Sequence, residues 1–532
     1  MAELLLQSLI FTPLVGALFI LAFRSDQGAR SLALIFSVIP FLASIWLYFS
    51  YTGEVAAGNV DENGFVYFIN LPWFTSGGFE INYTLGLDGI SIYLVLLTTL
   101  LFPLTIYFSW GSIGKHEIAY YILLLFLETG VIGFFLSLDM LLFYIFFEMV
   151  LIPMYFLIGI WGGKERIYAS LKFFLYTLVG SLLMLIAIIY LGINVPGKAF
   201  TTSYLTILEQ AEVGISTKVW LFWAFTLSFA IKVPLFPVHT WLPDAHTQAP
   251  TAGSVILAGV LLKMGTYGLI RFCLPLFPEA SVQFAPLLSG FAVVGIIYGA
   301  MAAMVQKDVK KLVAYSSVSH LGFIVLGIFA FTEEAMSGAI IQMVNHGIAT
   351  GALFLVVGMI YDRRHTRMIS DFQGLAKRVP IFTLVFMITV MASVGLPGLN
   401  GFVGEFLVLM GSFKSTVISQ AFAIFAASGV IIAAVYLLWM FRRVMFGELD
   451  KEENRNLIDL NGREVAVMLP LIILMFWMGF YATPFLKQIS SSSDKVVAFV
   501  LEENNLPSAN KTLQPLHEEE HDEHDTKLSV VP

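Results

Sequence analysis

Six ionisable residues stand within otherwise apolar stretches of this sequence, and their types define the chemistry open to the chain. They are Glu148, Lys232, Lys263, His320, His346 and Glu405. A charged side chain is costly to place in lipid, so such residues face one another or water inside a bundle of helices. Carboxylates, amines and imidazoles can each take up and release a proton. Their distribution therefore predicts a row of proton-transferring groups through a membrane.

The apolar segment around Lys232 is interrupted by two prolines, Pro234 and Pro237. Each proline removes a backbone donor and crowds the carbonyl four residues earlier, which breaks a helix. In a membrane, a broken helix persists only where protein or a water-filled cavity surrounds it. A second break is expected at Pro397, a few residues before Glu405. Paired breaks in related halves of a chain are typical of a transport site.

These residues also have structural interpretations. Lys232 could cap the carbonyl groups that the prolines leave free, and Glu148 could be a fixed ion-pair partner. Because charges within apolar helices are usually functional, we favour a transport role for the lysines and the acids. His320 and His346 could instead be core histidines bonded to backbone carbonyls, and for them both interpretations stay open.

Three further residues are weaker candidates for the path: Glu128, Asp244 and His246. Glu128 is either a second pathway group or a buried carboxyl bonded to a Thr or Tyr side chain. Asp244 and His246 are expected to cap and hydrogen-bond in the turn after the first break, with proton entry as the alternative.

Three other charged residues are expected to have structural roles. Asp139 is predicted to cap a helix. Lys172 and Arg271 lie near the ends of predicted helices, from which long side chains reach the membrane surface. None of the three is therefore placed in the path.

Composition indicates a membrane protein. Of the 532 residues, 58% are hydrophobic and only 12% are charged, whereas a soluble domain carries roughly 25% charged residues. The single cysteine, Cys273, excludes an internal disulfide and any cysteine-rich metal or iron–sulfur site. No nucleotide fingerprint or haem motif occurs in a supporting context. We therefore expect no cofactor and no metal in this chain, and no nucleic-acid partner.

Long apolar runs separated by Gly, Pro, Asn and charged residues predict an all-α polytopic membrane protein. We expect about fourteen transmembrane helices, the seventh and twelfth broken. They fall near residues 3–23, 31–51, 84–108, 118–137, 140–161, 168–193, 219–241, 251–274, 284–305, 311–331, 336–361, 380–410, 419–446 and 465–486. The longest predicted loop is about residues 52–83.

A weak internal repeat relates two parts of the chain. Glu148 precedes Lys232 by 84 residues, and His320 precedes Glu405 by 85. This spacing predicts two units of five helices, the second inverted in the membrane because five is odd. The predicted parts are three helices at 1–108, the two units at 118–274 and 284–446, a last helix at 465–486 and a polar tail at 488–532. The tail carries an acidic, histidine-rich run from His517 to His524, which we predict to be solvated rather than metal-binding.

Basic residues are distributed unevenly between the two sets of loops. The loops after odd-numbered helices hold most of the Lys and Arg, whereas the loops after even-numbered helices hold only Lys198, Lys218, Arg271 and Lys414. The positive-inside rule places the basic loops in the cytoplasm. Both termini are then expected on the outer, periplasmic side of a bacterial inner membrane.

The residue types suggest how a proton could move. A carboxylate stabilises the charged form of a nearby buried lysine, so a change in the Glu148–Lys232 distance would switch that lysine between holding and releasing a proton. Lys263, the histidines and water could pass the proton on to Glu405, which would release it on the opposite side.

Two long segments resemble the antiporter-like subunits of respiratory complex I. They are Phe143–Met154, around Glu148, and Phe229–Arg271, which carries Lys232, both prolines and Lys263. The resemblance covers roughly residues 80–450. It implies inverted five-helix repeats and a central row of lysine, glutamate and histidine. The helix 12 residue of that family is a lysine in two pumping paralogues and a glutamate, as Glu405 is, in the third.

The resemblance also implies an activity and partners. The chain would be a non-redox membrane subunit of a proton-pumping NADH:quinone oxidoreductase. Flavin, iron–sulfur clusters and quinone would be bound by partner subunits, and the neighbours would be other membrane subunits, antiporter-like ones included.

Three other functions fit parts of the same pattern. A subunit of a multisubunit Na+/H+ antiporter would use much the same residues without any NADH chemistry. An independent solute carrier should show aromatic and polar groups for its substrate, and none stand out. A passive scaffold would leave the intramembrane charges unexplained.

Overall fold

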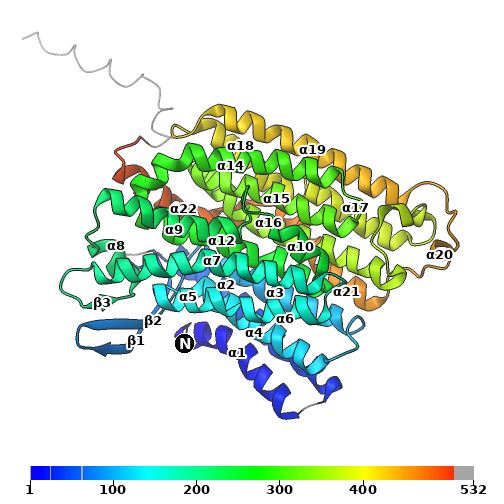
Figure 1. Ribbon diagram of the computed structural model, residues 1–532, viewed down its shortest axis with the longest axis horizontal. Coiled ribbons are helices and arrows are strands. Elements are labelled where there is room, and N and C mark those ends of the chain that lie inside the picture. The colour runs from blue at the N-terminus through cyan, green and yellow to red at the C-terminus, as the bar shows by residue number, and fades with distance from the viewer. Residues whose placement is uncertain (1, 24, 62–63, 508–532) are drawn as a thin grey trace, which may run out of the picture.

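Long apolar helices make up most of the fold and lie side by side in a bundle, with α1 at one edge and α18 and α19 at the opposite edge (Figure 1). The computed structural model describes residues 2–23, 25–61 and 64–507. In these ranges, twelve helices are long and apolar enough to cross a membrane, judged by length and composition. The predicted all-α polytopic class is therefore confirmed, although twelve rather than fourteen helices meet this criterion.

The twelve candidate spans follow the predicted order. They are α1 (Ala2–Phe23), α2 (Asp26–Ala56), α3 (Ser91–Ser109), α4 (Glu117–Leu136), α5 (Met140–Met149) together with α6 (Leu151–Trp161), α7 (Arg166–Ile193), the run α11 to α13 (Thr251–Leu276), α14 (Pro278–Met304), α15 (Val309–Phe329), α16 (Glu333–Arg364), α19 (Gln420–Met445) and α21 (Gly462–Phe480). The run α11 to α13 includes two π-helical turns, η1 (Leu257–Leu261) and η2 (Leu269–Cys273), on either side of α12 (Leu262–Gly268).

The other two predicted spans correspond to pairs of shorter helices. α9 (Ile215–Lys232) is followed by α10 (Trp241–Gln248), and α17 (Pro380–Val394) is followed by α18 (Asn400–Lys414). Pro234 and Pro237 lie in the segment between α9 and α10, and Pro397 lies between α17 and α18. Short helices outside the spans include α8 (Tyr204–Gln210) and α20 (Glu452–Arg455), and the 3-10 helices η3 (Ile369–Asp371) and η4 (Leu375–Lys377).

A β-hairpin replaces part of the longest predicted loop and the start of the predicted helix 84–108. Strand β1 (Tyr67–Ser76) pairs antiparallel with β2 (Phe79–Leu87), and β3 (Phe200–Thr201) adds to β2 in parallel. The turn is Gly77-Gly78, both with positive φ, which tight hairpins require. The boundary prediction was wrong because an apolar run joined to a helix cannot be told from a strand by hydrophobicity alone. The hairpin and α20 lie at opposite ends of the bundle (Figure 1).

A second departure is α22 (Thr483–Glu503), which covers the start of the predicted polar tail. This helix is amphipathic: Ile489, Val497 and Val500 are buried along one side, against α16 and α14. Sequence hydropathy missed it because an amphipathic helix has too few apolar residues to read as a span. The histidine-rich run from His517 to His524 lies outside the described residues.

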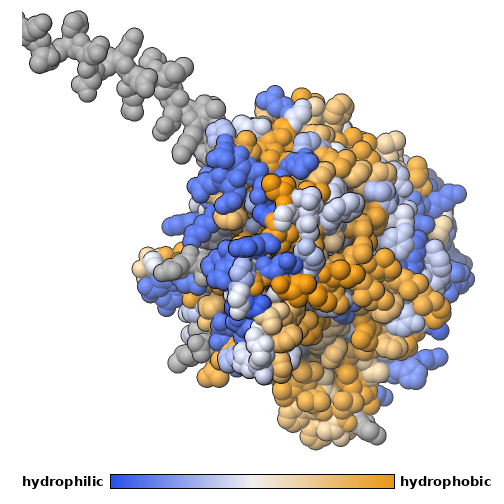
Figure 2. Space-filling model, turned by 60° about the vertical axis from the view of Figure 1, so that its left-hand side comes forward, coloured by the Kyte–Doolittle hydropathy of each residue, from blue (hydrophilic) through white to orange (hydrophobic). Residues whose placement is uncertain are grey.

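Apolar side chains cover much of the surface, as expected for a protein that lies in a membrane, and the most apolar parts of some helices are buried inside the bundle. On the face drawn in Figure 2, hydrophobic residues cover a broad area and hydrophilic residues gather mostly toward two sides. Exposed apolar side chains include Ile186 and Ile431, at 65% and 69% exposure. By contrast, the most apolar windows of α16 and of Thr251–Leu276 are 100% buried within the protein, and that of α15 is 94% buried. Lys263, His320 and His346, which these three spans carry, are buried and therefore face protein and not lipid.

Candidate functional site

His320 and Glu405 form a buried pair at one end of the candidate site. The Nδ1 atom of His320, on α15, lies 2.7 Å from Oε1 of Glu405, on α18, and both side chains are about 5% exposed. The amide of Gln342, on α16, donates to the same carboxylate oxygen at 3.1 Å. The carboxylate is therefore held by two neighbours from two other helices.

Lys263 and His346 form a second buried pair. Nζ of Lys263, on α12, lies 2.7 Å from Nδ1 of His346, on α16. The same amine donates to the carbonyl of Ala258, which belongs to the π-helical turn η1. Such turns displace the regular helical hydrogen bonds by one residue and occur often at functional sites.

The two pairs lie next to each other. The ring centres of His320 and His346 are 6.0 Å apart. Both rings line a small cavity with Thr350 and Asn345, which has room for roughly one water molecule. Four predicted residues thus form a row from Lys263 through both histidines to Glu405, drawn from four helices.

The segment between α17 and α18 is tied to the same helix α16. The side-chain amide of Asn345 donates to the carbonyl of Asn400 at 2.7 Å, and that of Asn400 donates back to the carbonyl of Asn345 at 3.3 Å. Asn400 is the first residue of α18. This reciprocal contact fixes the start of the helix that carries Glu405.

Glu148 and Lys232 face each other without a hydrogen bond. Lys232 is the last residue of α9, is 1% exposed, and its Nζ lies 4.7 Å from the ring centre of Phe147. Glu148 interacts electrostatically with Lys232 and lies beside the hydroxyl of Ser181. Among the described residues, Nζ of Lys232 has no hydrogen-bond partner. The two groups therefore interact electrostatically, without a hydrogen bond that joins them.

Within the described ranges, the hydrogen bonds of the Lys263 amine go to Ala258 and His346, and none joins it to Lys232. Their helices α9 and α12 pack closely at Gly265, where a Cβ would lie 2.7 Å from the carbonyl oxygen of Phe229. The six predicted residues are therefore brought together as two groups, with tightly packed backbone between them.

The weaker candidates differ in their surroundings. Glu128 is fully buried in α4, and neither carboxylate oxygen has a partner in the described part of the chain. Asp244 forms an ion pair with Lys172 at 2.7 Å, with both side chains partly exposed. His246 is fully buried and stacks on Phe354, with ring centres 4.6 Å apart. Neither of its ring nitrogens has a partner among the described residues.

Asp139 is a helix cap, as predicted. Its carboxylate accepts hydrogen bonds from the backbone N–H groups of Leu141 and Leu142, at 2.9 and 3.1 Å, in the first turn of α5. The hydroxyl of Thr202 donates to the other carboxylate oxygen at 2.7 Å. Burial raises the pKa of Asp139 to about 6.

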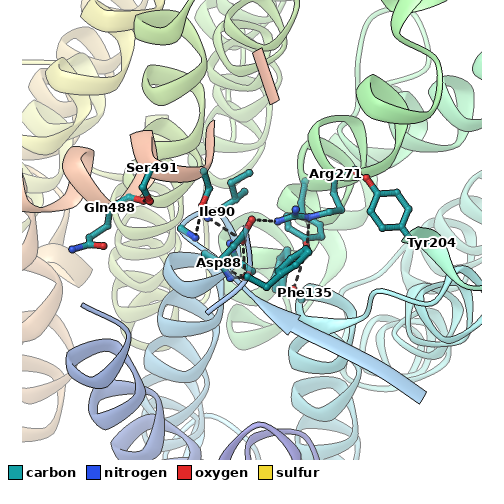
Figure 3. A network of polar contacts seen from close by, with 12 residues as sticks. Asp88, Ile90, Phe135, Tyr204, Arg271, Gln488 and Ser491 are labelled. Atoms are coloured by element: carbon teal, nitrogen blue, oxygen red, sulfur yellow. Dashed lines mark hydrogen bonds and ion pairs between the residues drawn. The ribbon is translucent and has the colours of Figure 1, made fainter. Parts of the chain in front are cut away.

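Arg271 is buried and paired inside the protein, whereas its side chain was expected to extend outward to the membrane surface. Figure 3 shows its guanidinium group pointing at Asp88, with which it forms a buried ion pair. Its Nε donates to the hydroxyl of Tyr267 at 3.2 Å, and the hydroxyl of Tyr204 donates to its carbonyl at 2.9 Å. Asp88 also accepts from the backbone N–H of Ser91 at 2.9 Å. The pair was not predicted because the sequence places Asp88 inside a helix, whereas in the structure it lies in the turn after β2.

Lys172 was likewise expected to extend its side chain to the membrane surface. Instead, it forms an ion pair with Asp244.

Sequence reasoning also missed polar residues around the row. Gln342 and Asn345 are buried on α16 near His346. Their spacing along an apolar helix, four and one residues before that histidine, is a signal that could have identified them. No group of three or more His, Cys, Asp or Glu in residues 2–23, 25–61 and 64–507 is arranged to hold a metal ion.

Comparison with known proteins gives a consistent result. Residues 137–433 match the family model described as NADH:quinone oxidoreductase/Mrp antiporter, TM. The chain is 46% identical to NADH-quinone oxidoreductase subunit M of Rhodobacter capsulatus, over 90% of this chain and 93% of the relative. It is 42% identical to NADH-ubiquinone oxidoreductase chain 4 of Chondrus crispus, over 92% and 96%.

A solved structure is also similar along almost the whole chain. It is a chain of respiratory complex I from Thermus thermophilus with bound NADH, with a TM-score of 0.83 and 31% sequence identity. The match covers 93% of this chain and 99% of that one.

Proposed function

Because this chain belongs to the NADH:quinone oxidoreductase/Mrp antiporter transmembrane family, in its subunit M and chain 4 branch, we propose that it translocates protons through its row of buried ionisable residues. It is an antiporter-like membrane subunit of NADH:quinone oxidoreductase, the respiratory complex I. The proton movement is coupled to quinone reduction, which takes place in other subunits. Flavin, iron–sulfur clusters and quinone are held by those partners.

The observation that carries this proposal is the row from Lys263 to Glu405. One hydrogen bond of 2.7 Å joins the Lys263 amine to the His346 imidazole, and another of 2.7 Å joins the His320 imidazole to the Glu405 carboxylate. The centres of the two imidazole rings are 6.0 Å apart. Each group can hold a proton in one state and release it in another. A single water in the cavity between the two rings would connect them by hydrogen bonds.

The pair Glu148 and Lys232 supplies the switch in this scheme. A shorter separation stabilises the charged lysine, and a longer one favours release of its proton toward Lys263. The absence of a hydrogen bond from Nζ in the described part of the chain supports a movable pair. Glu128 and Asp244 remain secondary candidates, the first as a buried side branch and the second as a solvated group near the break.

The helix interruptions have a role in the same scheme. α9 with α10, and α17 with α18, are each one span broken around Pro234, Pro237 and Pro397. Residues 118–274 and 284–446 are then two inverted repeats, each with one broken span and its own ionisable residues. The free helix ends expose backbone groups that can bind water in the path.

The proposed setting is the cytoplasmic membrane of a bacterium. The basic loops face the cytoplasm and both termini lie on the periplasmic side. Other membrane subunits, including neighbouring antiporter-like chains, flank this one in the lipid bilayer.

Replacement of Lys232 by alanine tests the function directly. The complete oxidoreductase carrying Lys232→Ala is purified and reconstituted in vesicles, and proton uptake per NADH oxidised is measured. We expect uptake to fall while the complex still assembles, and Lys307→Ala, an exposed lysine, is the matched control. Undiminished proton uptake in the Lys232→Ala vesicles would reject the scheme.

The same residues could also serve the alternative function, that of a subunit of a Na+/H+ antiporter. The family model covers both kinds of protein, but the relatives that cover about nine-tenths of the chain are oxidoreductase subunits. Proton uptake driven by NADH in the absence of sodium distinguishes the two functions.

A further inference from the structure

A cleft opens at the end of the bundle where the basic loops lie. It has a volume of about 110 Å³, enough for several water molecules. Its lining includes Gln248, Thr251, Lys310, Gly358 and Arg367. These residues come from α10, α11, α15, α16 and the loop after α16, so the cleft lies where five segments meet.

Lys310 is the buried cation of this cleft. It is 6% exposed, and its Nζ donates to the carbonyl of Ala249 at 2.5 Å. The neighbouring Arg367 forms an ion pair with Asp308 at 3.2 Å. In the described part of the chain, no carboxylate is paired in this way with Lys310. Its amine is therefore held by a neutral carbonyl, an arrangement in which it can exchange a proton with cleft water.

His246 lies between Lys310 and the row. It interacts electrostatically with Lys310 and Lys263, and His346 in turn interacts with it. Both ring nitrogens lack a partner among the described residues, although the ring is fully buried. An imidazole with one free donor and one free acceptor can take a proton at one nitrogen and release one from the other.

Helix α16 connects the cleft with the row. Gly358 lines the cleft, Phe354 stacks on His246, and Thr350 and His346 line the small cavity. These four residues follow one another at intervals of four, so each lies beside the next, about one turn along the helix. The stretch from Gly358 to His346 spans about 18 Å at 1.5 Å per residue.

We propose that this cleft admits protons from the basic-loop side, with Lys310 as the first acceptor and His246 as the carrier to Lys263 and His346. Lys310 gives one proton of its ammonium group toward His246, and a hydronium ion in the cleft then reprotonates the neutral amine and becomes water. The imidazole gains that proton at one nitrogen and loses one from the other toward Lys263 or His346, which leaves it as the opposite tautomer. A rotation of the ring then restores the starting tautomer, so each completed cycle moves one proton inward. The inference rests on the proposed proton translocation and adds its point of entry.

The test uses the complete oxidoreductase in proteoliposomes, with proton uptake per NADH oxidised as the readout. Lys310→Gln and His246→Asn are expected to lower this ratio by the same fraction as Lys263→Ala. Lys307→Gln changes an exposed lysine just before α15 and is expected to leave the ratio unchanged. A native gel reports whether each variant complex is intact.

Two further measurements separate proton transfer from packing. In His246→Gly, added imidazole is expected to restore uptake, which a purely structural histidine would not allow. In Thr251→Cys, a thiol reagent bulky enough to fill the cleft is expected to lower the ratio relative to the untreated variant and to the treated parent complex. The Thr251→Cys experiment leaves Lys310 and His246 unchanged. It therefore still tests the cleft if the complexes with substituted Lys310 or His246 fail to assemble.

The outcomes distinguish the entry route from the function it serves. If Lys263→Ala lowers the ratio but Lys310→Gln, His246→Asn and cleft blocking do not, protons enter elsewhere and the inference is overturned while translocation stands. If Lys263→Ala also leaves the ratio unchanged, translocation by this row fails, and the entry route fails with it.

Discussion

The Nδ1 atom of His320 lies 2.7 Å from Oε1 of Glu405, although 85 residues separate them in the chain. The contact joins α15 to α18, the helix that begins just after Pro397. It places an imidazole on the carboxylate that ends the row, so the two groups can share or exchange one proton.

Glu405→Gln tests the end of the row. Glutamine keeps the size and a hydrogen-bonding oxygen but cannot ionise, so we expect proton uptake per NADH to fall to the level of Lys232→Ala. Assembly should be unaffected. The control is Glu279→Gln, which alters a partly exposed carboxylate paired with Lys218 at 3.2 Å. Normal uptake in Glu405→Gln would remove this carboxylate from the path.

Gly404→Ala tests the packing that holds Gln342 on Glu405. A Cβ at Gly404 would lie 2.3 Å from Oε1 of Gln342 and 3.0 Å from its Cα. Such overpacking costs about 1–3 kcal/mol, and it displaces the amide from the carboxylate. We expect a lower melting temperature and reduced proton uptake.

Gly290→Ala is the control for that change, because the nearest atom to its Cβ would be 3.8 Å away. It should leave both the melting temperature and uptake close to normal. Equal behaviour of the two variants would contradict the tight contact at Gly404.

Asp88→Ala tests the buried ion pair with Arg271. Loss of one partner leaves an unpaired charge in a buried place, which costs about 3–5 kcal/mol. We expect a clear drop in the melting temperature of the purified complex. Lys414→Ala breaks a pair whose side chains are 36% and 24% exposed, and surface pairs of that kind contribute at most about 1 kcal/mol.

The double variant Asp88→Leu, Arg271→Met refines this result. Removal of both charges leaves no unpaired ion, so part of the stability should return relative to Asp88→Ala. A double variant no more stable than Asp88→Ala would show that the surrounding hydrogen bonds, and not the ion pair, hold this region together.

Acid should loosen the sheet at Glu80. The hydrogen bond from Lys198 holds the pKa of Glu80 below its ordinary value. A lowered pKa in the folded state means that the stabilisation is present above the ordinary pKa, about 4.3, and is lost as the pH falls through the lowered value. We expect faster amide exchange of β2 and β3 in that window, after correction for intrinsic rates.

Lys198→Met is the control for the acid effect. It removes the partner, so exchange of these strands should already be faster at neutral pH and should depend less on acid. A parent-like acid response in Lys198→Met would assign the effect to another group.

The sequence by itself determined which residues could do the chemistry and that they lie within membrane-spanning helices. Lys263, His320 and His346 each interrupt an apolar run, and burial of a charge in such a run is costly enough to imply a purpose. Apolar length predicted most helices, because the membrane thickness sets how many apolar residues a span needs. Family membership followed from the same motifs.

Only the tertiary structure decided which of these groups meet. The contacts of Lys263 with His346 and of Arg271 with Asp88 join residues far apart in the chain, and they depend on how helices pack and turn about their axes. The hairpin and α22 also needed the fold, because each is stabilised by neighbours that the local sequence does not specify. The link from Lys310 through His246 arises in the same way, where α10, α15 and α16 come together.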